Sequence, residues 1–198
     1  EGNTLTTMSA MKNIVAKAEV SESFEREVAI YDLNEFLASL SLFKSPVLEF
    51  DESFVTIKEE NTTTSLKYFY SDPSVVTTPS KTIKMPSKEV TFSLKGEDLT
   101  KLKRAAGVIG APDLVLERKD TGSFLTVKDK KNDTANTFSL DVTTTSEGNF
   151  NCFFTVENLK VMDGNYDVEI SSKNISHLSS SNKDVEYWVA LEPESTYE

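Results

Sequence analysis

The chain has 198 residues, of which 38% are hydrophobic, and its formal net charge at pH 7 is −11. This length allows one or two domains with a packed core, whereas the acidic balance excludes a protein that coats nucleic acid over its whole surface. The single cysteine, Cys152, excludes an internal disulfide framework, and no apolar run reaches the ~18 residues that a membrane span needs.

The first part of the chain predicts short strands interrupted by one helix. Asp32 with Glu35 three residues later is typical of a helix N-terminus. Four apolar residues then recur at helical spacing, and we expect them to bury one face against a sheet: Leu33, Phe36, Leu37 and Leu40. Alternating apolar and polar residues predict strands at 4–9, 14–20, 24–30, 47–50, 53–58 and 65–70.

Residues 71–88 differ from their surroundings, because three prolines and many small polar residues disfavour both a helix and a central strand. We therefore expect an extended connector there, between a first domain at 1–70 and a second at 89–198. The second domain is predicted to contain strands at 89–95, 113–119, 123–130, 136–144, 150–155, 164–171, 175–179 and 185–191, with helices at 97–109 and 156–162.

The helix expected at 97–109 combines an apolar face with a basic one. Its acidic residues are confined to the first turn, where they complement the helix dipole. A basic face on an acidic chain indicates a negatively charged partner, or merely solvent. The apolar stripe consists of Leu99, Leu102, Ala105, Ala106 and Ile109, and the basic side of Lys101, Lys103 and Arg104.

The two halves look like copies of one unit. Residues 28–37 parallel residues 152–161 as a strand running into a helix, followed in each half by three strands. The second copy opens with an additional strand and the basic helix, so the repeat predicts the same elements upstream of Glu1. Two α+β copies, each with helices against an antiparallel sheet, can be arranged around an axis as a ring with sheets outside and helices lining the pore.

Five segments give the chain a specific resemblance to the DNA polymerase sliding clamps of T-even-type bacteriophages and their relatives. They run in consistent order along the chain: Val28-Ala-Ile-Tyr-Asp-Leu-Asn-Glu-Phe-Leu, Asp72-Pro-Ser-Val-Val, Gly96-Glu-Asp-Leu, Met162-Asp-Gly-Asn-Tyr and Tyr187-Trp-Val-Ala-Leu-Glu-Pro-Glu-Ser-Thr. Family members carry a further N-terminal segment with a pore-facing helix ahead of the position equivalent to Glu1.

The resemblance implies a homotrimeric ring of two similar domains per subunit that encircles duplex DNA. It also implies partners: the replicative DNA polymerase, an ATP-driven clamp loader and late-transcription factors, all in the cytoplasm of an infected bacterium. Carried onto this sequence, the DNA-binding residues would be Lys95, Lys101, Lys103, Arg104 and Lys160. For each of these, a solvated surface cation is the simpler alternative.

The resemblance further implies a groove near the connector that receives a short hydrophobic peptide from the polymerase or the loader. Its lining would be Val75, Val76, Ile83, Leu191 and Pro193. These residues could equally well hold the connector against the sheet.

Catalytic interpretations find little support in the sequence. His177 is the only histidine, so no histidine cluster for a metal can be built, and Gly107-Val-Ile-Gly110 lacks the Lys-Ser/Thr of a phosphate loop. We therefore expect no enzyme activity, metal or cofactor. The alternative to a clamp is a β-rich structural or adhesion module of a virion, in which the basic helix would be incidental.

Overall fold

The computed structural model describes residues 2–79, 82–146 and 148–198, and its sheets are antiparallel throughout. Two compact units are present: the first is built on Glu22–Thr78, the second on Thr4–Ser21 and Pro79–Glu198. Residues 4–21, which the sequence assigns to the first domain, thus belong to the second unit; the domain boundaries stay a prediction. Two α-helices with antiparallel sheets confirm the α+β class.

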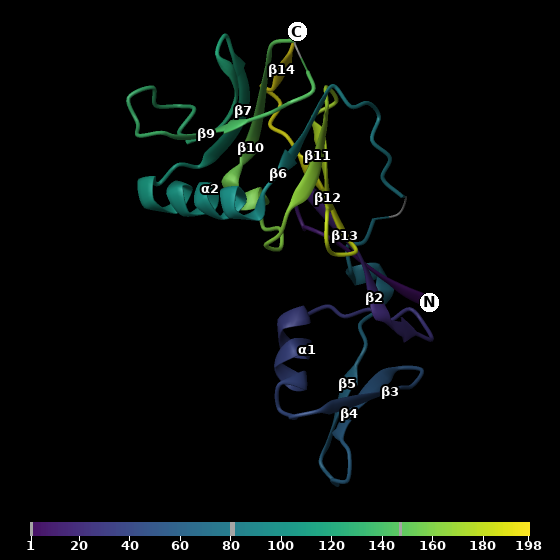
Figure 1. The fold of residues 1–198 in the computed structure, drawn as a ribbon. Coiled ribbons are helices and arrows are strands. Elements are labelled where there is room, and N and C mark those ends of the chain that lie inside the picture. The colour runs from purple at the N-terminus through teal and green to yellow at the C-terminus, as the bar shows by residue number, and fades with distance from the viewer. Residues whose placement is uncertain (1, 80–81, 147) are drawn as a thin grey trace. The chain divides into compact units, whose positions relative to one another are not determined.

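The first unit contains helix α1, Leu33–Leu40, and a three-stranded sheet in the order β3-β4-β5 (Figure 1). Asp32 begins the helix as predicted, because its Oδ1 accepts a hydrogen bond of 3.0 Å from the amide of Glu35. Val55 and Ile57 on the central strand are fully buried. The bounds are β3 Pro46–Phe50, β4 Phe54–Glu59 and β5 Ser65–Phe69, followed by the short 3₁₀ helix η1, Pro73–Val75.

The apolar stripe of α1 does not bury itself against this sheet, so that part of the prediction is wrong. Leu33 and Leu37 are 58% and 52% exposed, and none of the helix residues is buried. Phe36 makes the main contact, edge-on to Tyr68 of β5 with ring centroids 5.1 Å apart. A three-stranded sheet within this unit offers too little surface to cover a whole helix face.

The strand predicted at 24–30 is also wrong, and with it the strand half of the first repeat. Strand β2 runs from Ile14 to Phe24 without a break, and residues 25–30 are irregular. The carbonyl of Ala29 accepts a hydrogen bond from the amide of Ser71, but this single bond is not a ladder. A strand needs at least one neighbouring strand for its ladder of hydrogen bonds, and residues 25–30 do not have a partner strand in the described part of the chain.

The second unit contains two sheets, one in the order β1-β2-β13-β12-β11-β6 and one in the order β14-β10-β7-β8-β9 (Figure 1). Its core draws on both sheets and on helix α2, Gly96–Ile109. The strands are β1 Gly2–Met8, β6 Val90–Leu94, β7 Asp113–Lys119, β8 Gly122–Lys128, β9 Phe138–Val142, β10 Phe150–Thr155, β11 Tyr166–Ser171, β12 Ile175–Ser180, β13 Val185–Ala190 and β14 Thr196–Tyr197.

Two details of the second unit differ from the sequence prediction. The helix predicted at 156–162 is only a 3₁₀ turn, η2, Val156–Asn158. The chain leaves the helical conformation because Leu159 and Val161 are both buried in the core, whereas Lys160 between them is exposed. The last strand in the sequence prediction is 185–191, whereas a further strand, β14, pairs with the edge of β10. The connector at 71–88 is irregular apart from η1, and its residues 80 and 81 lie outside the described residues.

Helix α2 is the longest helix of the described ranges, and none there has the length and apolarity to cross a membrane. Leu99, Leu102 and Ala106 are at most 3% exposed, as the helical spacing predicts, whereas Val108 is 78% exposed. The position of this helix therefore depends on three buried side chains.

We predict that Leu102→Ala lowers the free energy of unfolding of the second unit by about 2–5 kcal/mol, because it removes buried apolar surface and leaves a cavity. Trp188, the only tryptophan, lies in this unit and reports its denaturant transition by fluorescence. Val108→Ala on the same helix is the control and should change stability by less than about 0.5 kcal/mol. Equal effects of the two changes would contradict the burial of this face of α2.

Candidate nucleic-acid interface

Glycines fix both ends of α2. At the start, the amide of Gly96 donates a hydrogen bond of 2.8 Å to Oδ1 of Asn165. A Cβ at Gly96 would stand 2.9 Å from the carbonyl oxygen of Gly164, so no larger residue fits without a shift. At the end, Gly110 adopts the left-handed conformation, φ 67°, and its amide bonds to the carbonyl of Ala106. These contacts fix where the helix begins and ends, and the burial of Leu99, Leu102 and Ala106 fixes its rotation about its axis.

This rotation places Lys101 and Arg104 on the solvent face, one turn apart. Lys101 lies 3.5 Å from Oδ1 of Asp98, and its side chain remains 57% exposed. A pair this exposed contributes little, since the median surface ion pair is worth about 0–1 kcal/mol. Arg104 forms no ion pair with any residue that the structure describes. Both cations are thus open to an external anion.

Lys103 lies at the margin of the buried face. It is half-buried, and its Nζ donates a hydrogen bond of 3.0 Å to the carbonyl of Val161. Burial lowers the pKa of Lys103, and the charge of Asp163 opposes that shift. Lys103 therefore fastens the segment after η2 to the helix, and its role in DNA binding stays a prediction.

Lys160 lies beside α2 because of this same bond. It is the second residue after η2 and is exposed, while its neighbours Leu159 and Val161 are buried. Since Val161 accepts the hydrogen bond from Lys103, Lys160 is one residue away from a contact with the helix. The structure thus places Lys101, Arg104 and Lys160 on α2 and on the segment fastened to it.

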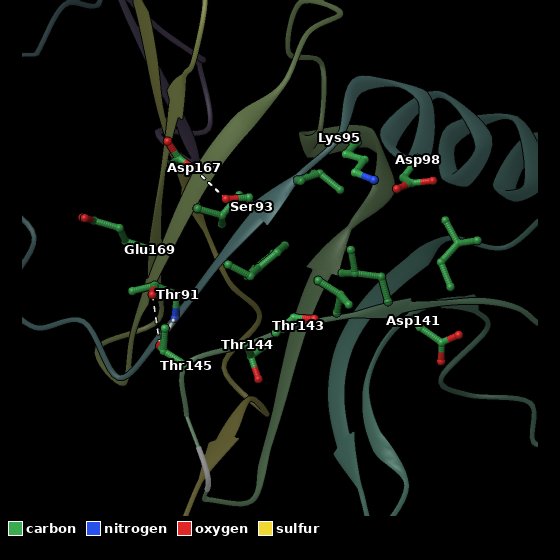
Figure 2. Close-up of a pocket in the computed structure, with 16 residues that line it drawn as sticks. Thr91, Ser93, Lys95, Asp98, Asp141, Thr143, Thr144, Thr145, Asp167 and Glu169 are labelled. Atoms are coloured by element: carbon green, nitrogen blue, oxygen red, sulfur yellow. Dashed lines mark hydrogen bonds between the residues drawn. The ribbon is translucent and has the colours of Figure 1, made fainter.

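Lys95 has different surroundings. It is exposed at the N-cap of α2 and lines a groove of about 670 Å³ between the edge strands β6 and β9 (Figure 2). Hydrogen bonds within the groove join Ser93 to Asp167 and Thr91 to Thr145. The charged residues that line it are Lys95, Asp98, Asp141, Asp167 and Glu169. Four carboxylates against one ammonium disfavour a phosphate backbone in this groove, and the DNA-binding role of Lys95 stays a prediction.

The basic residues of the sheets contrast with those of α2, because acids pair with them. Glu117 lies 2.8 Å from Lys119 and 3.6 Å from Lys128, and it accepts a hydrogen bond from Thr126. Burial raises the pKa of Glu117, but these partners outweigh burial and lower it. Lys88 pairs with Glu169 at 2.5 Å in the same way. These lysines thus have close acidic partners, whereas on the solvent face of α2 Lys101 has only the exposed pair with Asp98 and Arg104 has no ion pair among the described residues.

The residues predicted for a partner groove differ in exposure. Val75 is 54% exposed, Val76 and Ile83 are half-buried, and Pro193 is exposed. Leu191 contributes its side chain to the core of the second unit. Val75 and Val76 belong to the first unit and the other three to the second, so the groove that would unite them stays a prediction.

The remaining reactive side chains have structural surroundings. His177 stacks on Trp188 at 4.9 Å, and its Nε2 lies 2.9 Å from Oε2 of Glu186. Cys152 is fully buried, as its Phe-rich segment predicts, and burial raises the pKa of its thiol to about 12. Among the described residues there is no group of three or more His, Cys, Asp or Glu side chains that could hold a metal.

The contacts that sequence reasoning missed are tertiary. Neither the fastening of Lys103 to Val161 nor the close approach of Gly96 and Gly164 has a local signal. The return of residues 192–198 to β10 was missed because Glu192-Pro-Glu194 reads as the end of a strand.

The chain is similar to known proteins over nearly its whole length. The family model described as "gp45 sliding clamp, C terminal" matches residues 91–193. The sliding clamp of Vibrio phage KVP40 is 30% identical over 197 residues, covering 96% of this chain and 88% of the relative. The sliding clamp of Enterobacteria phage T4 is 28% identical over 202 residues, covering 100% and 89%.

Among solved structures, the fold matches a chain described as "C-terminal region of FEN-1 bound to A. fulgidus PCNA", with a TM-score of 0.69 and 16% identity over 98% of this chain and 87% of that one. This likeness, together with the antiparallel sheets and two α-helices, agrees with the clamp fold that the resemblance implies. With the family model matching more than half of its residues, the chain belongs to the gp45 sliding clamp family of bacteriophages.

Proposed function

We propose that this chain assembles into a homotrimeric ring that encircles duplex DNA and tethers the replicative polymerase. The observation that carries the proposal is the exposure of Lys101 and Arg104 on the solvent face of α2, in a chain of net charge −11 from the sliding clamp family. A sliding clamp is not an enzyme, and the expected lack of catalysis agrees with this family. No feature of the fold favours the virion module.

Few cations suffice for a ring. Contacts between basic side chains and phosphates are independent of sequence and weaken steeply with salt. A protein that surrounds DNA is retained by its topology, so weak contacts keep it centred and still allow it to slide. The acidic balance of the remaining surface repels DNA from the outside and favours passage through a basic pore.

In the proposed trimer, each subunit needs a free sheet edge to contact its neighbour. Strands β6 and β9 end the two sheets of the second unit and flank the acidic groove. The outer edge of β6 is partly occupied, because Thr91 exchanges hydrogen bonds with Thr145, so we infer that the outer edge of β9 contacts a neighbouring subunit. A closed head-to-tail ring uses two different surfaces of each copy.

Partner proteins would dock near the connector. The solved clamp with a similar fold holds the C-terminal region of FEN-1, which supports a peptide-binding role for clamps of this shape. In this chain Val75 is more than half exposed in an otherwise polar segment. We infer that the polymerase, an ATP-driven clamp loader and late-transcription factors dock on the connector around Val75 and Val76.

We predict that Lys101→Glu with Arg104→Glu shortens the products of loader-dependent primer extension and leaves the fold intact. Both side chains are exposed, so the change removes interactions with phosphates without disturbing the core. The dependence of DNA binding on salt should weaken by about one unit of the log–log slope for each phosphate that is no longer neutralised.

Lys12→Glu with Lys173→Glu, two exposed cations outside α2, is the matched control for net charge. If it shortened the products as much as the double change on α2, the effect would belong to overall charge and not to this helix.

We predict that Val75→Asp with Val76→Asp weakens polymerase binding and leaves DNA binding unchanged, because charges placed in an apolar groove oppose a hydrophobic peptide. A binding titration with the polymerase measures the first effect, and salt-dependent DNA binding the second. Equal polymerase affinity of mutant and wild type would exclude this part of the connector from the docking site.

We predict that light scattering over a range of concentrations shows a species of about 66 kDa, three times the chain mass of 22.0 kDa, that dissociates on dilution. If the protein remained monomeric at high concentration, a self-assembling ring would be excluded.

A further inference from the structure

The end of the chain, Glu192–Glu198, lies as a strap along β10. Backbone contacts are sparse: strand β14 has two residues, which pair Tyr197 with Phe150 and Thr196 with Asn151. Elsewhere the amide of Glu192 bonds to the carbonyl of Phe153 at 2.8 Å, and the amide of Phe153 bonds to the hydroxyl of Ser195 instead of a backbone carbonyl. A strand held so thinly is close to the low-stability end of a fold.

One lysine binds the strap by charge. Nζ of Lys130 lies 2.6 Å from Oε1 of Glu194 and 3.7 Å from Oε2 of Glu192. Its third acidic neighbour, Asp113 at 3.6 Å, belongs to β7 and is 5% exposed, so it fixes the lysine in place. The hydroxyl of Thr155 also donates to Glu192. We call Lys130 with Glu192 and Glu194 the latch.

The latch depends on salt and not on physiological pH. Burial lowers the pKa of Lys130, but the hydrogen bond with Glu194 and the charges of Asp113, Glu194 and Glu192 outweigh it and raise this pKa. The hydrogen bond from Lys130 lowers the pKa of Glu194. The lysine therefore loses its charge only above its ordinary range, and Glu194 only below its own, so both stay charged near neutrality. Salt screens the exposed Glu194.

The strap covers a buried thiol. Cys152 on β10 is fully buried, and Tyr197 of the strap lies near its thiol. The buried hydroxyl of Tyr197 has no hydrogen-bond partner among the described residues. The fit of the strap is therefore imperfect, and its departure would make β10 the edge of the sheet and uncover Cys152.

We propose that residues 192–198 are a displaceable strand that leaves β10 and frees its edge for an extended acidic segment of a partner protein. The strap itself defines the chemistry of that partner: an extended backbone for β10, and carboxylates spaced as in Glu192-Pro-Glu194 for Lys130. Addition of a strand to a sheet edge is a common mode of peptide recognition. The proposed clamp function rests on Lys101 and Arg104 of α2, whereas this proposal rests on the strap and Lys130. Failure of the strap proposal would therefore leave the clamp function unaffected.

The first test uses Cys152, the only cysteine, as a reporter of strap opening in the full chain. Labelling by a thiol-specific chromogenic disulfide should be about tenfold faster in Lys130→Gln and in Glu194→Gln than in wild type, since each removes a charge-assisted hydrogen bond. Added salt should accelerate labelling of the wild type and have little effect on these variants.

Lys128→Gln is the matched control. Nζ of Lys128 lies 5.9 Å from the Phe153 ring centroid, as Nζ of Lys130 lies at 5.7 Å, but Lys128 pairs with Glu117 and not with the strap. Its labelling rate should match wild type. The denaturant midpoint from Trp188 fluorescence identifies any variant whose faster labelling comes from global unfolding. Unchanged rates in Lys130→Gln and Glu194→Gln with intact folds would overturn the latch.

The second test supplies a strap in trans. A fluorescent peptide with the sequence of residues 191–198 should bind the Glu192→Gln/Glu194→Gln protein, whose own strap is weakened and whose Lys130 is intact, and fluorescence anisotropy detects the complex. Adding Lys130→Gln to that protein, or replacing both glutamates of the peptide by glutamine, should abolish binding. Equal binding in all three cases would show that Lys130 does not select an acidic segment.

Discussion

The attachment of α2 to the core of the second unit is the constraint on which the functional surface depends. Leu99, Leu102 and Ala106 fix the rotation of the helix, and this rotation alone decides that Lys101 and Arg104 face solvent. Burial of three apolar side chains contributes several kcal/mol, far more than the exposed pair of Lys101 with Asp98. The hydrophobic effect thus positions the charges, and the charges themselves have little to do with holding the fold.

Charged residues have different surroundings on the sheets and on helix α2. On the sheets, lysines lie beside carboxylates, as Lys119 and Lys128 do beside Glu117, and half-buried charge requires such partners. On α2, Lys101 and Arg104 are exposed and need no partner to be stable. An acidic protein can therefore present a local basic surface without cost to its core, which reconciles the net charge of −11 with a DNA-encircling role.

Periodicity predicted those elements whose pattern is local and strong. The spacing of leucines placed α2 within one residue, and strands β7 and β10 have the predicted bounds. Failures occurred where partners far along the chain decide the outcome. Residues 25–30 alternate like a strand but lack a partner strand in the described part of the chain, and the stripe of α1 has too small a sheet to cover it. Lys103 reads as one of three equivalent cations, because a bond to Val161, 58 residues away, has no local signature.

The central claim is that the protein holds DNA by surrounding it, and the most direct measurement is retention on DNA of different topology. The assembled protein is loaded onto nicked circular DNA, separated from unbound protein by gel filtration, and the DNA is then cut once with a restriction enzyme. A ring around DNA should stay on the circle in high salt and leave soon after linearisation, by sliding off the ends. Equal retention on circular and cut DNA, or dissociation from the circle in high salt, would contradict it.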